Sequence, residues 1–208
     1  MATQAADTTR VVALDLMDTL VHDPYREALR AATGLDVADL FARRPAASWP
    51  AFERGELDED AYWQGFREVG IAFDAEAFHA VRRERTTLLP GMAELLAELR
   101  RVVPVVVASN YPGWVHEVVA DVLAGAVDGV VASCDVGVRK PEPAFYAHVV
   151  TAARDAAGAA ALEAAAVLFV DDRAANVEAA REAGLDAVEF TGPADLRAEL
   201  CHRGVLPG

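Results

Sequence analysis

Residues 11–20 of this 208-residue chain are Val-Val-Ala-Leu-Asp-Leu-Met-Asp-Thr-Leu. Four apolar residues followed at once by a carboxylate are typical of a buried strand that ends in an acidic side chain. In open α/β sheets, ligands bind just past the carboxyl ends of the strands. Asp15 is therefore expected to lie where a nucleophile or a metal ligand is useful.

Further apolar runs alternate with helical segments along the rest of the chain. Four more strands are predicted at residues 102–108, 127–132, 167–170 and 187–190. The helices predicted around them span residues 92–101, 114–123, 143–156, 174–183 and 194–202. This alternation predicts an α/β fold with a doubly wound, Rossmann-like parallel sheet.

One interval, residues 21–88, has no strand pattern and predicts helices only. They are expected at residues 24–33, 37–43, 49–54, 58–69 and 74–86, with Asp58 and Asp74 as N-caps. We predict an all-helical domain at residues 21–88, inserted into a core domain of residues 1–20 and 89–208. Two uses are open for its aromatic residues: a stacking face for a flat ring, or the small core of the helical domain. The residues concerned are Trp49, Phe52, Tyr62, Trp63 and Phe66.

Composition and charge exclude several classes of protein. Hydrophobic residues make up 53% of the chain, which argues against disorder. The formal net charge of −14 argues against a nucleic-acid partner. The polar start of the chain and the lack of a 20-residue apolar stretch predict a cytoplasmic protein with no membrane partner. The two cysteines, Cys134 and Cys201, are expected to be free thiols, and nothing in the sequence indicates an oligomeric state.

Four polar clusters each lie at the end of a predicted strand or close to one. They are Asp15 to Thr19, Ser109-Asn110, Arg139-Lys140-Pro141, and Asp171-Asp172 with Asn176. Because strand ends of one polarity share one edge of a parallel sheet, we expect these clusters to converge on a single crevice.

The chemistry that uses such a set is the transfer of a phosphoryl group from a monoester to a carboxylate, here Asp15. Asp15, Asp171 and Asp172 would each repel a phosphate dianion, by about 4 kcal/mol per pair at ~4 Å and an effective dielectric of ~20. A cation must therefore lie between them, and Mg²⁺ suits hard oxygen ligands. Lys140 adds a second positive charge, and the remaining phosphoryl oxygens are assigned to Thr19, Ser109 and Asn110.

At these residues the chain resembles the haloacid dehalogenase-like (HAD) superfamily. The four motifs of that superfamily correspond to Asp15-Leu16-Met17-Asp18-Thr19, Ser109, Lys140 and Asp171-Asp172. The resemblance implies that Asp15 is the nucleophile. It also implies that Asp15, the Met17 carbonyl and Asp172 hold Mg²⁺, with Asp171 nearby, and that the helical insertion is a C1 cap.

Within the superfamily, the pattern is most similar to plant chloroplast flavin mononucleotide (FMN) hydrolases. The similarity lies in the first motif with its Met and in Asp23-Pro24-Tyr25, and it continues in four further stretches. These are residues 49–55, 109–112 and 139–143, together with 169–173. This resemblance implies a small phosphorylated metabolite as substrate, with FMN as one candidate.

One position departs from the pattern of HAD phosphatases. The general acid and base of those enzymes is an Asp two residues after the nucleophile, and here that residue is Met17. Three interpretations follow: a phosphatase that obtains its proton elsewhere, a metal-independent dehalogenase-type hydrolase, or a binding protein with little turnover. For the first, the candidate proton sources are Asp18, His22 and a metal-bound water. Asp18 occupies a position where the family usually has Gly.

Overall fold

The computed structural model describes residues 10–208, and in these residues five parallel strands form one sheet. The order across the sheet is β3-β2-β1-β4-β5. The strands are β1 (Val11–Leu14), β2 (Val105–Ser109), β3 (Gly129–Ala132), β4 (Val167–Asp171) and β5 (Asp186–Glu189). The central strand β1 pairs with β2 and β4, so Ala13 lies between Val106 and Phe169. The predicted parallel α/β sheet is therefore confirmed.

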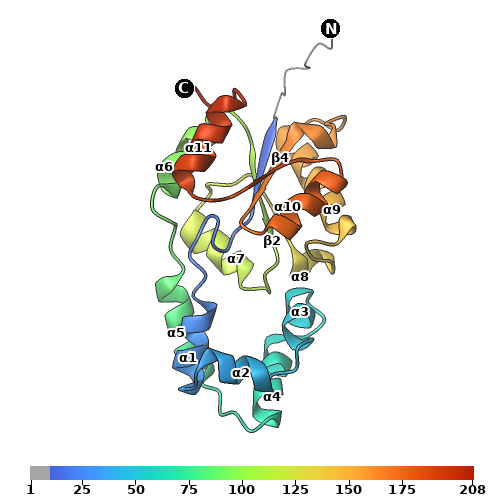
Figure 1. Ribbon diagram of the computed structural model, residues 1–208. Helices are drawn as coiled ribbons and strands as arrows, with labels where there is room; N and C mark the ends of the chain where they lie inside the picture. The colour runs from blue at the N-terminus through green and yellow to red at the C-terminus, as the bar shows by residue number, and fades with distance from the viewer. Residues whose placement is uncertain (1–9) are drawn as a thin grey trace.

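Successive residues of β1 face opposite sides of the sheet and enter two separate hydrophobic cores. Val12 and Leu14 pack in one core, and Val11 and Ala13 pack in the other. The first core is covered by α6 (Met92–Leu99), α7 (Val115–Val118) and α11 (Pro193–His202). The second core is covered by α9 (Pro143–Ala157) and α10 (Ala174–Glu182), on the opposite flank of the sheet in Figure 1.

Several boundaries differ from the prediction for local reasons. The second strand begins at Val105, not at Val102, because the N–H groups of Val102 and Val103 bond to the Leu99 carbonyl in the turn that ends α6. The predicted helix at residues 114–123 is α7 followed by a π-helical turn, Val119–Leu123. Two short elements were not predicted: α8 (Ser133–Val136) and a 3₁₀ turn at Ala164–Ala166.

Between β1 and α6 the chain forms five helices, which we call the insert. They are α1 (Tyr25–Thr33), α2 (Val37–Arg43), α3 (Ser48–Glu53), α4 (Glu59–Glu68) and α5 (Ala75–Arg85). The Asp58 and Asp74 carboxylates cap α4 and α5, as predicted from the sequence. In Figure 1 the insert lies beyond the carboxyl ends of the strands, joined to the core at Val21 and Leu88, which pair in an antiparallel bridge.

The aromatic residues of the insert mostly form its core. Phe52, Tyr62, Trp63 and Phe66 are buried, and the rings of Phe52 and Tyr62 stack with their centroids 4.6 Å apart. Trp114, which precedes α7, stacks on Trp63 with centroids 5.7 Å apart and so extends this aromatic core to the sheet domain. Core packing is therefore the role of four of the five aromatic residues considered from the sequence.

Both cysteines are free thiols. In residues 10–208, no helix combines the length and the apolar character that crossing a bilayer requires. Residues 1–9 lie outside the described residues. The prediction from the polar start of the chain rests on these residues.

Candidate active site

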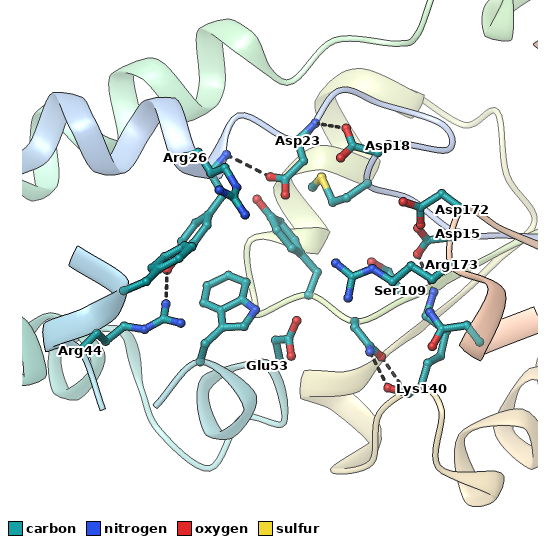
Figure 2. A pocket seen from close by; sticks show the side chains of 17 residues that line it. Asp15, Asp18, Asp23, Arg26, Arg44, Glu53, Ser109, Lys140, Asp172 and Arg173 are labelled. Atoms are coloured by element: carbon teal, nitrogen blue, oxygen red, sulfur yellow. Dashed lines mark hydrogen bonds and ion pairs between the residues drawn. The ribbon is translucent and has the colours of Figure 1, made fainter. Parts of the chain in front are cut away.

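A cavity of about 250 Å³ lies between the carboxyl ends of the strands and the insert. One side, which we call the core wall, is formed by Asp15, Ser109, Lys140 and Asp172. The opposite side, the insert wall, is formed by Tyr25, Arg26, Phe41, Arg44, Trp49 and Glu53. Figure 2 shows the two walls facing each other, with the Arg173 guanidinium reaching between them. All four polar clusters singled out in the sequence contribute residues to this cavity.

Lys140 is buried and is held by three oxygen acceptors at the bottom of the core wall. Its Nζ donates to Asp15 Oδ1 at 2.5 Å, to Asp171 Oδ2 at 2.7 Å and to the Ala108 carbonyl at 2.7 Å. Burial alone would lower the pKa of Lys140, but the two carboxylates outweigh it and raise that pKa. The ammonium group therefore stays charged and fixes Asp15 and Asp171, with its third hydrogen bond going to the Ala108 carbonyl.

Asp15 follows β1 and is 7% exposed. Burial raises its pKa to about 7; the charge of Lys140 opposes this shift, and the nearby Asp171 adds to it. Because Lys140 binds Oδ1, the second carboxylate oxygen is left to react. The geometry agrees with the nucleophile position predicted for Asp15.

The two residues of the acidic pair at the end of β4 have different surroundings. Asp171 is wholly buried behind Lys140, and its Oδ1 accepts hydrogen bonds from the Arg173 N–H and from Asn176 Nδ2, both at 2.9 Å. Asp172 is half-buried and lines the cavity. Burial raises the pKa of Asp172, and the charge of Asp171 raises it further. Of the pair, Asp172 therefore offers its carboxylate to the cavity.

The donor set at this end of the cavity fits a magnesium ion. Asp15, Asp171 and Asp172 each place a carboxylate oxygen within 4.8 Å of the other two. Burial and the charge of Asp171 raise the pKa of both Asp15 and Asp172, so a positive charge beside these carboxylates would favour their ionised forms. Hard oxygen ligands in this number suit Mg²⁺. Asp15, Asp172 and the carbonyl of Met17, which also lines the cavity, are the residues that would hold it.

The three residues assigned to phosphate binding lie in different situations. Ser109 lines the cavity, and its buried Oγ has no hydrogen-bond partner within residues 10–208, so this hydroxyl is available to a phosphoryl oxygen. The Asn110 side chain instead bonds the backbone of Lys140 twice, through Nδ2 and Oδ1, each at 2.8 Å. Its side chain thus positions the loop that carries Lys140.

Thr19 is not among the residues that line the cavity. It is buried in a tight turn in which the Leu16 carbonyl accepts the N–H groups of both Leu20 and Val21. Its Oγ1 is buried and has no hydrogen-bond partner in the described part of the chain. The structure therefore does not bring Thr19 to the phosphate-binding wall, because the turn holds it below the surface.

The region around Met17 contains the predicted substitutes for the missing acid. Asp18 lines the cavity with a left-handed backbone, φ 57°, a conformation that Gly adopts without strain. Its Oδ1 accepts the Asp23 N–H at 3.1 Å, so its side chain is turned toward the backbone of the loop (Figure 2). His22 is not among the lining residues, and its Nε2 lies 3.0 Å from Glu27 Oε1.

The insert wall contains residues to which the sequence assigned no role. The Phe41 ring lies between two guanidinium groups, those of Arg26 at 5.3 Å and Arg44 at 4.8 Å from its centroid. Arg44 also donates to the hydroxyls of Tyr25 and Tyr62 at 2.8 Å. Phe41 and Arg44 lie at the end of α2, whereas Arg26 belongs to α1 and Tyr62 to α4. No spacing in the sequence links these three helices, which meet only in the fold.

Glu53 of α3 and Arg173 were missed as well. Glu53 is buried and forms an ion pair with Arg139 at 2.7 Å; burial raises its pKa although Arg139 opposes the shift. Arg173 directly follows the acidic pair in the sequence, and this position next to a motif could have identified it as a residue of the site.

The fold also brings His116, Cys134 and Asp135 together outside this cavity, although their spacing in the sequence gave no indication of it. His116 Nε2 lies 3.1 Å from Asp135 Oδ1, and Cys134 Sγ lies 3.6 Å from the same oxygen. Their polar atoms thus satisfy one another, and the cluster needs no ion to explain it.

Comparison with known proteins places this site in a family. The family model for haloacid dehalogenase-like hydrolases matches residues 9–184. The flavin mononucleotide hydrolase 1 of Arabidopsis thaliana chloroplasts is 31% identical over 198 residues, covering 94% of this chain and 78% of that protein. A sesquiterpene phosphatase of Aspergillus oryzae is 30% identical over 165 residues, covering 76% of this chain and 80% of that protein.

A similar solved structure is that of a HAD family enzyme of Bacteroides thetaiotaomicron, in complex with magnesium and inorganic phosphate. It superposes with a TM-score of 0.70 at 17% identity, covering 86% of this chain and 93% of that one. At this identity the likeness concerns the fold, and it agrees with the sheet order described above.

Proposed function

This chain belongs to the haloacid dehalogenase-like hydrolases, and from that premise we propose that it is a magnesium-dependent phosphomonoesterase that acts through a phosphorylated Asp15. One observation carries the proposal. Asp172 lines the cavity, and its carboxylate lies within 4.8 Å of those of Asp15 and Asp171, beside the buried Lys140. A dehalogenase-type hydrolase, which needs no metal, has no use for this concentration of negative charge.

The residues of the core wall divide the work of phosphoryl transfer. Lys140 holds one oxygen of Asp15, so the other is oriented for attack on phosphorus. The unpartnered Ser109 hydroxyl donates to a phosphoryl oxygen, and Lys140 contributes positive charge. Mg²⁺, when bound by Asp15, Asp172 and the Met17 carbonyl, supplies the charge that lets a phosphate dianion approach the carboxylates.

We propose FMN as the substrate, as in the Arabidopsis relative named for its hydrolysis. The insert wall supports a flat ring system: the rings of Tyr25 and Trp49 lie with their centroids 4.3 Å apart, and Trp49 is half-buried at the cavity. The Arg26 and Arg44 guanidinium groups on the same wall favour a ring with polar edges over a hydrocarbon chain such as that of a sesquiterpene.

The test is a turnover assay with FMN, an isoprenoid alkyl phosphate and a small alkyl phosphate, each with Mg²⁺ and with excess chelator. We expect phosphate release with Mg²⁺, loss of activity in chelator, and the highest kcat/KM for FMN. Full activity in chelator would contradict the role of the metal. A preference for the isoprenoid ester would overturn the substrate proposal and leave the reaction class standing.

A further inference from the structure

The core wall lacks a group that can protonate a leaving alkoxide. Met17 has no proton to give, and the three protons of Lys140 Nζ are bound to Asp15, Asp171 and the Ala108 carbonyl. A positioned general acid typically contributes a factor of ~10²–10⁴. The leaving oxygen lies on the side of phosphorus away from Asp15, so an acid that replaces Met17 has to face the cavity from the direction of the insert.

Three carboxylates line the cavity besides Asp15 and Asp172: those of Asp18, Asp23 and Glu53. Glu53 is already engaged in an ion pair with Arg139 at 2.7 Å, whose charge opposes the rise in pKa that burial causes. Asp18 is exposed, and its Oδ1 accepts the Asp23 N–H at 3.1 Å, so it acts on the backbone of the loop. The remaining carboxylate, Asp23, forms no ion pair with any described residue, and a backbone N–H binds only one of its two oxygens.

Asp23 lies at the junction between the first-motif loop and α1. Its Oδ1 accepts the Tyr25 N–H at 3.0 Å, while its own N–H is bound by Asp18. The first bond holds Oδ1 of the Asp23 side chain and the second holds the Asp23 backbone, while Oδ2 has no hydrogen-bond partner among the described residues. Figure 2 shows the Asp23 carboxylate pointing into the cavity, across from Asp15.

The surroundings of Asp23 suit a group that must hold a proton and later accept one. Burial raises its pKa, and the charge of Asp18 acts in the same direction. The Tyr25 N–H, His22 and Arg173 act in the opposite direction, and Arg173 places its guanidinium in the same cavity. A carboxyl with a raised pKa is a better acid catalyst near neutral pH than an ordinary one.

We propose that Asp23 is the general acid and base of this enzyme and takes over the task that Met17 cannot perform; the proposal rests on the phosphomonoesterase function above. In the first step a bond forms between an Asp15 oxygen and phosphorus. The bond between phosphorus and the leaving oxygen breaks, and the Asp23 proton moves to that oxygen, which keeps the bonding electrons.

In the second step the Asp23 carboxylate takes a proton from water. The water oxygen bonds to phosphorus, the bond between phosphorus and Asp15 breaks, and inorganic phosphate leaves. Asp23 is then protonated again and Asp15 is again a carboxylate. Asp18, which holds the Asp23 N–H, is a positioning residue in this scheme.

The experiment compares an aryl phosphate with an alkyl phosphate, because an aryl oxide leaves with little protonation and an alkoxide needs much. In Asp23→Asn, kcat/KM should fall by ~10² or more on the alkyl ester and by less than about tenfold on the aryl ester. Asp74→Asn, at a carboxylate that likewise accepts a backbone N–H at the start of a helix but does not line the cavity, is the matched control and should leave the ratio of the two esters unchanged. Met17→Asp added to Asp23→Asn should restore alkyl-ester turnover.

Asp23→Ser serves if Asp23→Asn does not fold, because a serine hydroxyl also accepts the Tyr25 N–H and carries no acidic proton. Equal losses on the two esters, or no loss, would overturn the role of Asp23 while wild-type activity keeps the phosphomonoesterase function intact. If the wild-type enzyme with Mg²⁺ hydrolyses neither of these esters nor FMN, the phosphomonoesterase function is refuted and the role of Asp23 with it.

Discussion

The two walls of the cavity are built in different ways. In the core wall, charged hydrogen bonds hold the reacting carboxylate: Lys140 binds Asp15, Asp171 and the Ala108 carbonyl within 2.7 Å. In the insert wall, ring–ring and guanidinium–ring contacts at 4.3–5.3 Å surround Trp49 and Phe41. Arg44 of the same wall also donates to the Tyr25 and Tyr62 hydroxyls at 2.8 Å. The first arrangement tolerates little displacement, whereas the second leaves room for ligands of different shape. We infer that the core wall determines the reaction and the insert wall selects the leaving group.

The largest expected effect is at Asp15. Asp15→Asn should lower turnover of every phosphate ester by at least ~10⁴. Without the nucleophile, the other core-wall residues can no longer contribute to the rate of phosphoryl transfer. The amide is nearly isosteric, so the thermal unfolding midpoint should change little. Activity within about tenfold of wild type would show that Asp15 does not attack phosphorus.

A second substitution tests whether Lys140 organises the core wall. Lys140→Met leaves Asp15 and Asp171 as buried carboxylates without a counter-charge, which costs about 3–5 kcal/mol of unfolding free energy. Turnover should fall by ~10² or more on all substrates alike, since Lys140 also faces the phosphate. Chemical denaturation measures the change in unfolding free energy, and kcat measured on the same preparation gives the change in turnover. An unchanged unfolding free energy would mean that the ion pairs are not the main support of this wall.

Asp171 and Asp172 allow a test within the core wall. Asp172→Asn should raise the Mg²⁺ concentration needed for half-maximal activity by at least ~10-fold, since even outer-shell partners of a metal contribute that much. Asp171→Asn should instead lower the unfolding free energy, by about 3 kcal/mol, because it removes a buried partner of Lys140. Magnesium titration and chemical denaturation of both variants separate the two roles. If Asp171→Asn raised the magnesium requirement more than Asp172→Asn, Asp171 and not Asp172 would be the metal ligand.

The smallest expected effect is in the insert wall. Trp49→Leu should raise KM for FMN about 3- to 10-fold, as expected for the loss of one aromatic contact of about 0.5–1.5 kcal/mol. Turnover of a small alkyl phosphate, which does not reach this wall, should stay as it is in wild type. Phe145→Leu, in the second core and away from the cavity, provides a comparison for nonspecific loss of packing. If Trp49→Leu impairs both substrates equally, the insert wall does not select the leaving group.

The difference between the walls also explains how much could be predicted from the sequence. Most of the core wall was predictable because its residues lie at strand ends: Asp15 follows β1, Ser109 ends β2 and Asp172 follows β4. Lys140, in the loop between α8 and α9, was predicted from its motif. Thr19 and Asn110 were assigned to phosphate from their motifs. The sequence could not show that a tight turn buries the first or that the second clamps the Lys140 backbone.

The insert wall could not be predicted because its residues converge only in three dimensions. Arg26 belongs to α1 and Arg44 ends α2, and neither position carries a periodic or motif signal. Trp49 could not be distinguished by residue type from Phe52 or Trp63, which are buried in the insert core. Helix ends were predicted closely where a capping Asp or a terminal Gly marks them, as at Asp58 and Gly34.

The most direct test of this account is the identity of the group attached to Asp15 during turnover. Wild-type protein is mixed with FMN and Mg²⁺, quenched in acid within one turnover, digested and analysed by mass spectrometry. We expect one added phosphoryl group on the peptide that contains Asp15, and none on the same peptide of Asp15→Asn. Turnover without a phosphorylated Asp15, or a carbon-linked adduct on that residue, would contradict it.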